Sequence, residues 1–235
     1  SGNVYVGGLF ASAGTTTVNR IAKWNGSGWS ALGPGLQGLT TNYVYDLAFD
    51  ASGNLYAGGA FLTAGATTVN YLAKWNGSAW SALGGGVGNT VWAVEVDSSG
   101  NLYTGGEFGT AGATTVNYIA KWNGSAWSAL GGGMSGGNFG ATVVYALAFD
   151  ASGNLYAAGD FTAASATTLY RIAMWNGTDW SAVGEGLNPA ATSVRKIVFD
   201  SSGTLYAGGS FTSTDAQATP INRLAKWNGT SWSQV

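Results

Sequence analysis

The stretch KWNGSAWSAL at residues 74–83 decides the fold, because near-copies of it recur along the whole chain. Asn-Gly between apolar residues is a strong short-range signal for a β-hairpin, since a two-residue type I′ turn needs positive φ at both central positions. The sequence therefore predicts a hairpin loop at Asn76 and Gly77, with both Trp rings on one face. A four-residue loop would instead pair the two rings directly. The other copies lie at residues 23–32, 121–130, 174–183 and 226–234.

A second repeated tract, SGNLYAGG at residues 52–59, fixes the length of the unit. Its copies begin at Ser1, Ser99, Ser152 and Ser202, so successive units start 47 to 53 residues apart. From the serine of each tract to the second Trp of the pair is 28 residues in four units and 30 in the fifth. Almost all of the length variation therefore falls in one connection, after the second Trp.

Each unit divides into four expected strands. The innermost strand is an apolar run such as VYDLAFD at residues 44–50. A D-x-S-G turn follows, in which Asp50 accepts hydrogen bonds from its own turn and Gly53 supplies a left-handed position. The second strand is NLYAGG, a Thr-rich loop leads to the third, and the hairpin leads to the fourth. No segment shows a helical period long enough to predict a helix.

Four antiparallel strands repeated at this interval are typical of β-propeller blades. The sequence predicts an all-β fold, a five-bladed β-propeller of four-stranded antiparallel blades that forms a single domain over residues 1–235; a stacked solenoid is the alternative. The expected units are residues 1–43, 44–90, 91–143, 144–193 and 194–235. The innermost strand occurs four times and the others five times, so the first blade lacks its innermost strand. We expect this open edge to contact other copies of the chain or the remainder of a longer parent protein.

A family resemblance appears at these residues. The pattern LYxGGxF, followed by Asn, Ile/Leu-Ala-Lys-Trp-Asn-Gly and Trp-Ser-Ala-Leu-Gly, resembles the kelch-like repeats of the fungal cortical cell-polarity marker family and of related bacterial surface proteins. The D-x-S-G-N-L-Y turn is also similar to NHL and delta-60 propeller repeats. The resemblance covers the whole chain. It implies a propeller on an exported protein and carries over no catalytic residue, because those families are not defined by one.

The composition argues against several functions. Only 9% of residues are charged and the formal net charge is −2, which gives no electrostatic footprint for nucleic acid or for an anionic membrane. No apolar run approaches the ~20 residues of a membrane span, so no membrane insertion is expected. The chain has no Cys and no His, which excludes disulfides, a His-dependent triad and the preferred ligands of zinc. Neither a metal nor a cofactor is expected, and the Asp residues of the turns are interpreted as turn-forming.

The candidate ligand-binding residues gather at one expected rim. There the second and third residues of the innermost strands meet the residue between each Gly pair and the following Phe. The set is Tyr45, Asp46, Trp92, Glu107, Tyr145, Asp160, Arg195 and Lys196. Aromatic faces with a few charges suit stacking on sugar rings and hydrogen bonds to hydroxyls. The alternative is that the aromatics pack between blades while the charges keep the domain soluble.

Two further hypotheses concern covalent chemistry. Glu107 and Asp160 take the same place in adjacent blades, and Asp46 or Glu95 could approach the channel, so a glycoside hydrolase is a remote alternative. Nothing local marks these acids as catalytic, and no enzyme activity is expected. Each hairpin Asn also lies in Asn-Gly-Ser or Asn-Gly-Thr, formally an N-glycosylation acceptor, although the turn explains it too. These residues are Asn25, Asn76, Asn123, Asn176 and Asn228.

The sequence thus favours a non-catalytic extracellular or cell-surface propeller that acts as a structural or assembly module. Low charge, Thr- and Gly-rich loops and the unfinished first blade all suit such a role. A carbohydrate-binding, lectin-like module that uses the rim aromatics is the main alternative, with glycans as the partner.

Overall fold

The computed structural model describes residues 2–38, 42–187, 193–214 and 220–235. Within these ranges the chain forms β-strands and turns, with one short 3-10 helix, η1 (Asn138–Gly140). Four sheets have four antiparallel strands each, and the sheet of the first unit has three. The all-β prediction is confirmed, and among the described residues the first unit contributes three strands to its sheet. We number the sheets one to five along the chain.

Each sheet follows the predicted order from the innermost to the outer strand. The innermost strands are β7 (Val44–Phe49), β13 (Val91–Val96), β20 (Val143–Phe149) and β26 (Val194–Phe199). The second strands are β1 (Val4–Gly7), β8 (Leu55–Gly59), β14 (Leu102–Gly106), β21 (Leu155–Asp160) and β27 (Leu205–Gly209). The third strands are β4 (Ile21–Trp24), β11 (Leu72–Trp75), β17 (Ile119–Trp122), β24 (Ile172–Trp175) and β28 (Leu224–Trp227). The outer strands are β5 (Trp29–Ala31), β12 (Trp80–Ala82), β18 (Trp127–Ala129), β25 (Trp180–Ala182) and β29 (Trp232–Gln234).

The turn after the innermost strand forms as the sequence predicts. Oδ1 of Asp50 accepts hydrogen bonds from the main-chain N–H groups of Ser52 and Asn54, at 3.0 and 2.8 Å. Gly53 adopts a φ of 81°. At the other end of the strand, the register shifts between Val44 and Asp46, so Tyr45 lies at a β-bulge. The same shift occurs in β13, β20 and β26, and a bulge re-aims the side chain that it carries.

The hairpin loop is longer than predicted. Trp75 pairs directly with Trp80, which leaves a four-residue loop instead of the two-residue type I′ turn. The reason lies in the Asn side chain: Oδ1 of Asn76 accepts from the N–H groups of Ser78 and Ala79 at 3.0 and 2.9 Å. Only the Gly of the Asn-Gly pair has positive φ, whereas a type I′ turn needs it at both residues. The paired Trp rings lie 5.3 Å apart, tilted by 50°.

Short strands link consecutive units along the outer part of the arc. The Thr-rich loops form the pairs β2 (Ser12–Ala13) with β3 (Thr16–Thr17), β9 (Thr63–Ala64) with β10 (Thr67–Thr68), β15 (Thr110–Ala111) with β16 (Thr114–Thr115), and β22 (Ala163–Ala164) with β23 (Thr167–Thr168). Two strands from preceding connections join them: β6 (Leu36–Gln37) pairs with β9, and β19 (Met134–Ser135) pairs with β22. The long connection of one unit is thereby tied to the next unit.

Over the described part of the chain, the core forms four clusters, each shared by two consecutive sheets. We call the face that a sheet turns toward the preceding sheet its leading face, and the opposite one its trailing face. At the first junction the trailing face of sheet one contributes Tyr5, Ile21, Leu32 and Leu36, and the leading face of sheet two contributes Leu55, Ala57, Phe61 and Trp80. Close approach explains the Gly pair of the second strand, because a Cβ on Gly58 would overlap the side chain of Val91 in the next sheet.

A Trp side chain also makes a directional bond across every junction. Nε1 of Trp80 donates to the carbonyl oxygen of Leu32 in the preceding unit at 2.8 Å. The equivalent bonds run from Trp127 to Leu83 at 3.0 Å, from Trp180 to Leu130 at 2.9 Å and from Trp232 to Val183 at 2.9 Å. Each buried indole N–H is thus satisfied by the neighbouring unit, which fixes the register between sheets.

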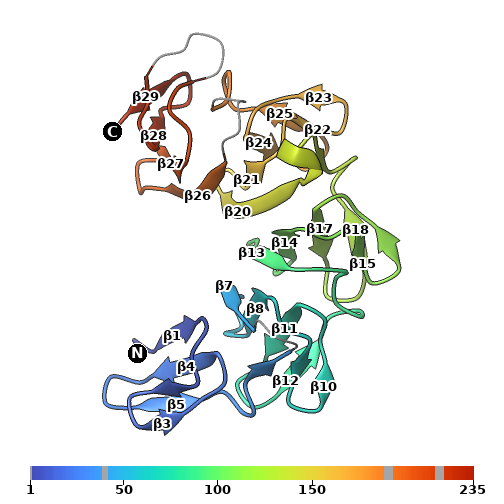
Figure 1. The fold of residues 1–235 in the computed structure, drawn as a ribbon, viewed down its shortest axis with the longest axis vertical. Helices are drawn as coiled ribbons and strands as arrows, with labels where there is room; N and C mark the ends of the chain where they lie inside the picture. The colour runs from blue at the N-terminus through green and yellow to red at the C-terminus, as the bar shows by residue number, and fades with distance from the viewer. Residues whose placement is uncertain (1, 39–41, 188–192, 215–219) are drawn as a thin grey trace.

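The five sheets follow one another along an open arc, with the innermost strands on its concave side (Figure 1). Sheets one and five lie at the two ends of this arc, and both termini are on the same side of the view. Among the residues that the structure describes, no core cluster joins sheet five to sheet one. Propeller-type units are therefore present, but a closed ring of five blades is not confirmed.

Candidate functional site

A groove lies between β1 and β7, where the other sheets carry their innermost strand. It encloses about 300 Å³ and is open to solvent. Its lining residues are Tyr5, Val6, Gly7, Val44, Tyr45, Asp46 and Leu47. Phe49 packs edge-on against Tyr5 with ring centroids 4.9 Å apart, yet it remains 46% exposed because no innermost strand of sheet one covers it. The missing strand therefore leaves both a backbone edge and apolar surface uncovered.

The hydrogen-bonding pattern identifies the free groups on the β1 edge. In sheet two, Gly59 donates its N–H to the third-strand side, at Tyr71, so Tyr56 and Gly58 present their main-chain groups to the innermost strand. Gly8 donates in the same way to Arg20 in sheet one. By the same alternation, Tyr5 and Gly7 present N–H and C=O groups to the groove. These groups match those that an added antiparallel strand uses.

The second residues of the innermost strands, together with Tyr43, form a row of aromatic side chains. Tyr43 stacks on Tyr45 with centroids 5.4 Å apart, and Tyr45 stacks on Trp92 at 4.0 Å. Trp92 meets Tyr145 edge-on at 5.5 Å, and the guanidinium of Arg195 lies 3.9 Å from the centroid of Tyr145. These side chains therefore lie together, and their ring faces are largely used against one another.

Two of the three predicted acids, Glu107 and Asp160, already bind other side chains. Oε1 of Glu107 accepts a hydrogen bond from Nε1 of Trp92 at 2.8 Å. Asp160 forms an ion pair with Arg171, whose side chain is fully buried, and also accepts from the N–H of Asn138 at 3.1 Å. Burial lowers the pKa of Arg171, and the charge of Asp160 opposes that effect. Asp160 therefore balances a buried cation, a role that the sequence did not indicate.

A charged cluster lies beside the aromatic row and consists of Asp46, Glu95 and Lys196. Asp46 accepts from the N–H of Val94 in the next sheet at 3.0 Å. Burial raises the pKa of Asp46, while this bond and Lys196 lower it. Burial and the nearby Asp46 charge raise the pKa of Glu95 to about 7, with Lys196 acting in the opposite direction. The cluster therefore brings together two carboxyl groups with raised pKa values, Asp46 and Glu95, and one cation, Lys196.

Six of the eight predicted residues line one cavity of about 240 Å³. They are Tyr45, Asp46, Trp92, Tyr145, Arg195 and Lys196. A cavity of this kind offers ring edges, two cations and a carboxyl group to a polar ligand. Glu107 and Asp160 are not among its lining residues, so the structure does not bring all eight together in one site.

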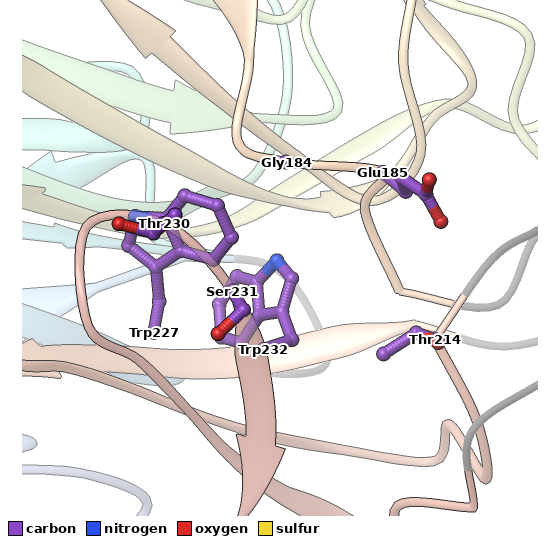
Figure 2. A pocket seen from close by; sticks show the side chains of 7 residues that line it. All are labelled: Gly184, Glu185, Thr214, Trp227, Thr230, Ser231 and Trp232. Atoms are coloured by element: carbon purple, nitrogen blue, oxygen red, sulfur yellow. The ribbon is translucent and has the colours of Figure 1, made fainter. Parts of the chain in front are cut away.

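A further cavity, not anticipated from the sequence, lies between the loop that follows sheet four and the Trp pair of sheet five (Figure 2). It encloses about 320 Å³ and is lined by Gly184, Glu185, Thr214, Trp227, Thr230, Ser231 and Trp232. A Cβ on Gly184 would crowd the Trp227 ring, so the loop of the preceding unit lies directly against the Trp pair. Glycine and Trp meet in the same way at Gly33 and Gly131, which identifies this feature as part of the repeat.

The other predicted sites keep their turn geometry. All five candidate glycosylation residues lie in exposed hairpin loops, where each Oδ1 accepts main-chain N–H groups. Within the described ranges, no group of three or more acidic residues is placed to hold a metal ion. None of the described segments forms a helix that could span a membrane.

Comparisons with known proteins identify a fold but no family. No protein-family model matches the chain, and no curated protein matches its sequence. The extracellular domain of BT4673 from B. thetaiotaomicron, described as a hybrid two-component system, superposes with a TM-score of 0.56 at 13% identity over 92% of this chain. PorZ, described as an essential bacterial surface component of the type-IX secretion system of Porphyromonas gingivalis, gives 0.54 at 15% identity over 92%.

This likeness is one of fold alone. The chain spans 25% of the length of the BT4673 structure and 31% of that of PorZ. It supports a propeller-type arrangement like that of bacterial surface and extracellular domains. It does not support the kelch-like or fungal resemblance of the repeat pattern.

Proposed function

We propose that the chain is a non-catalytic module of the cell surface or extracellular space, and that it assembles by accepting a β-strand in the groove between β1 and β7. The groove carries this proposal, because it combines a free strand edge with uncovered apolar surface at the place of a missing strand. The extracellular domain of BT4673 and the bacterial surface component PorZ, which share the fold, support the location.

The expected occupant is an extended segment with the pattern of an innermost strand. In sheet four, Ala146 and Ala148 of that strand pair with Ala158 and Tyr156. The equivalent positions of a bound strand would pair with Gly7 and Tyr5, while its apolar side chains would cover Phe49. Strand addition of this kind takes affinity from main-chain hydrogen bonds and specificity from alternate side chains.

A labelled peptide tests this assembly mode. The peptide VYALAFD, which has the sequence of residues 144–150, is titrated with the full chain and followed by fluorescence anisotropy. We expect saturable binding. The matched control is the same peptide with N-methyl groups at its two internal Ala residues that face β1. The loss of two main-chain bonds of about 1 kcal/mol each predicts roughly thirtyfold weaker binding. Equal binding of both peptides, or none, would rule out strand addition.

Carbohydrate binding is the second candidate. It is favoured by the cavity of about 240 Å³ that the aromatic row lines together with Asp46, Arg195 and Lys196. Trp92 is central to that cavity and contacts both Tyr45 and Tyr145. A glycan array with the full chain should then give selective signals that Trp92→Ala abolishes while the fold is retained. A flat array response from the intact fold would remove this candidate.

Two minor hypotheses, a glycoside hydrolase and glycosylation of the hairpin Asn residues, can each be tested separately. A glycoside hydrolase would need Glu107 and Asp160 to face one open cleft with their carboxyl groups about 5 to 10 Å apart. Their bonds to Trp92 and Arg171 argue against that use. Glycosylation at the hairpin Asn residues remains compatible with their exposure, and intact mass measurement of the secreted chain would detect it.

A further inference from the structure

We infer that the cavity which the aromatic row lines together with Asp46, Arg195 and Lys196 binds saccharides that carry a carboxylate, and that Arg195 recognises this group. The inference rests on carbohydrate binding, the second candidate function above, and deepens it by naming the class of sugar. It does not depend on strand addition, which uses the main-chain groups of β1.

Arg195 takes a position that the other innermost strands fill with an aromatic residue. It lies at the β-bulge of β26, where β7, β13 and β20 carry Tyr45, Trp92 and Tyr145. A bulge re-aims the side chain that it carries, and these four side chains line the same cavity. Arg195 therefore adds a cation to a row that is otherwise aromatic.

The guanidinium of Arg195 is held in place by two contacts. It lies 3.9 Å from the ring centroid of Tyr145, and its Nε donates to Oγ of Ser193 at 3.0 Å. Ser193 is itself buried, and its N–H donates to Oγ of Ser210 at 2.9 Å. The bond to Ser193 does not use the terminal NH2 groups, which form the fork that binds a carboxylate through two parallel hydrogen bonds. A side chain that is fixed in advance loses little entropy when a ligand binds.

The charge of Arg195 is available to an anionic ligand. Within the described ranges Arg195 forms no salt bridge, and its side chain is exposed. Two acids beside the row are bound to other side chains, Glu107 to Trp92 and Asp160 to Arg171. A carboxylate on a ligand therefore meets a cation that no acid of the chain already pairs.

Lys196 adds a second and weaker positive charge to the same cavity. Burial raises the pKa of Asp46 and of Glu95, and the charge of Lys196 opposes this effect at both. Because Lys196 lies within electrostatic reach of these two acids, its charge is partly matched inside the chain. Recognition of the ligand carboxylate therefore falls chiefly to Arg195.

The rest of the cavity suits an oxygen-rich ligand. Trp92 and Tyr145 meet edge-on, and ring edges carry the positive part of the aromatic quadrupole, which favours hydroxyl and ring oxygens. Asp46 accepts from the N–H of Val94 at 3.0 Å, and a carboxylate has lone pairs for further donors such as a sugar hydroxyl. The volume of about 240 Å³ is small. It lies below the roughly 300 Å³ at which sites for drug-sized ligands begin, so it suits a single sugar unit of a chain.

Isothermal titration calorimetry with the full chain tests the inference. The probes are trimers of galacturonic, glucuronic and mannuronic acid, each beside the neutral trimer of galactose, glucose or mannose with the same linkage. We expect saturable binding of a uronate trimer, roughly tenfold or more tighter than binding of its neutral counterpart, because a charge-assisted pair is made only with the carboxylate.

Three variants locate the recognition. Arg195→Gln should weaken uronate binding roughly ten- to hundredfold, because the bidentate pair is lost. Lys196→Gln should weaken it about threefold, as expected of an exposed charge. Lys226→Gln removes the same charge from a strand that does not line the cavity, so this matched control should bind as wild type does. Circular dichroism checks that all three variants keep the fold.

Equal binding of the uronate and neutral trimers would overturn the inference and leave the carbohydrate candidate standing. Equal uronate affinity of wild type and Arg195→Gln would do the same. Acetate that binds as tightly as the uronate trimers would show that charge alone is recognised, which would overturn the saccharide class. Absence of binding by every trimer would remove both the inference and the carbohydrate candidate, while the strand peptide tests the assembly role separately.

Discussion

Trp80 and Trp29 hold the same place in the repeat but lie in different surroundings. Trp80 is 7% exposed and bonded to the preceding unit, whereas Trp29, in the first sheet of the arc, is half-buried and makes no such bond among the described residues. The same contrast separates Leu72 from Leu224 at the other end. Burial in this molecule is therefore set by whether a neighbouring sheet is present, since the repeated residues are otherwise alike.

The largest expected effect comes from removing these rings. Trp80→Ala should lower the free energy of unfolding by about 3 to 5 kcal/mol, because it leaves a cavity and an unpaired carbonyl in a packed junction. Trp29→Ala should cost less than about 2 kcal/mol, because solvent already reaches that ring. Chemical denaturation of both variants measures the difference. Equal costs would mean that the end face is covered in solution as the junctions are.

A smaller effect is expected from Glu95, which takes the trailing-face position held by Ala48 in sheet two and by exposed Val198 in sheet five. Its pKa is raised from an ordinary value of 4.5 to about 7, so the folded state holds a proton that the unfolded state has lost. Stability should therefore fall as pH rises from about 4.5 to about 7 and level off above that.

Glu95→Gln removes this loss. At pH 8 the variant should be more stable than wild type by about 1 to 2 kcal/mol, after allowance for solvent screening of a partly exposed group. Near pH 4 the two proteins should unfold alike. The measurement is chemical denaturation across this pH range, and an unchanged pH slope in Glu95→Gln would contradict the assignment.

The smallest expected loss of stability comes from the hairpin loops, and it should be equal in the first sheet and in an interior sheet. Asn76→Ala and Asn25→Ala each remove an acceptor of two main-chain N–H groups in an exposed hairpin loop. Each should cost about 1 kcal/mol of unfolding free energy, because the loop does not touch a junction. Denaturation midpoints compare the two. A clearly larger cost at Asn76 would show that the loops also contribute to packing between sheets.

Repetition and turn residues made most of the secondary structure predictable. The strands, the Asp50 turn and the missing innermost strand all followed from residue types at fixed offsets. The hairpin loop did not, because the side chain of Asn76 bonds within the loop and stabilises four residues instead of two. The closed ring of five blades is not confirmed, and single residues could not decide it, because the rotation between sheets depends on how whole faces pack.

The candidate site was also predictable only in part. The convergence of Tyr45, Trp92 and Tyr145 followed from their shared position in the innermost strands. The use of their ring faces against one another depends on the distance between sheets and could not be read from spacing. The pairing of Asp160 with buried Arg171 was also missed, because a loop residue supplies the cation at a position where another unit has Tyr71.

The directional Trp bond has a consequence for how such a chain can change over generations. Each unit carries one donor for the unit before it and one acceptor for the unit after it. Duplication or deletion of a whole unit of about fifty residues therefore preserves every remaining contact, and the new neighbours are compatible from the start. Length in this architecture can vary by gene rearrangement without any compensating point mutation.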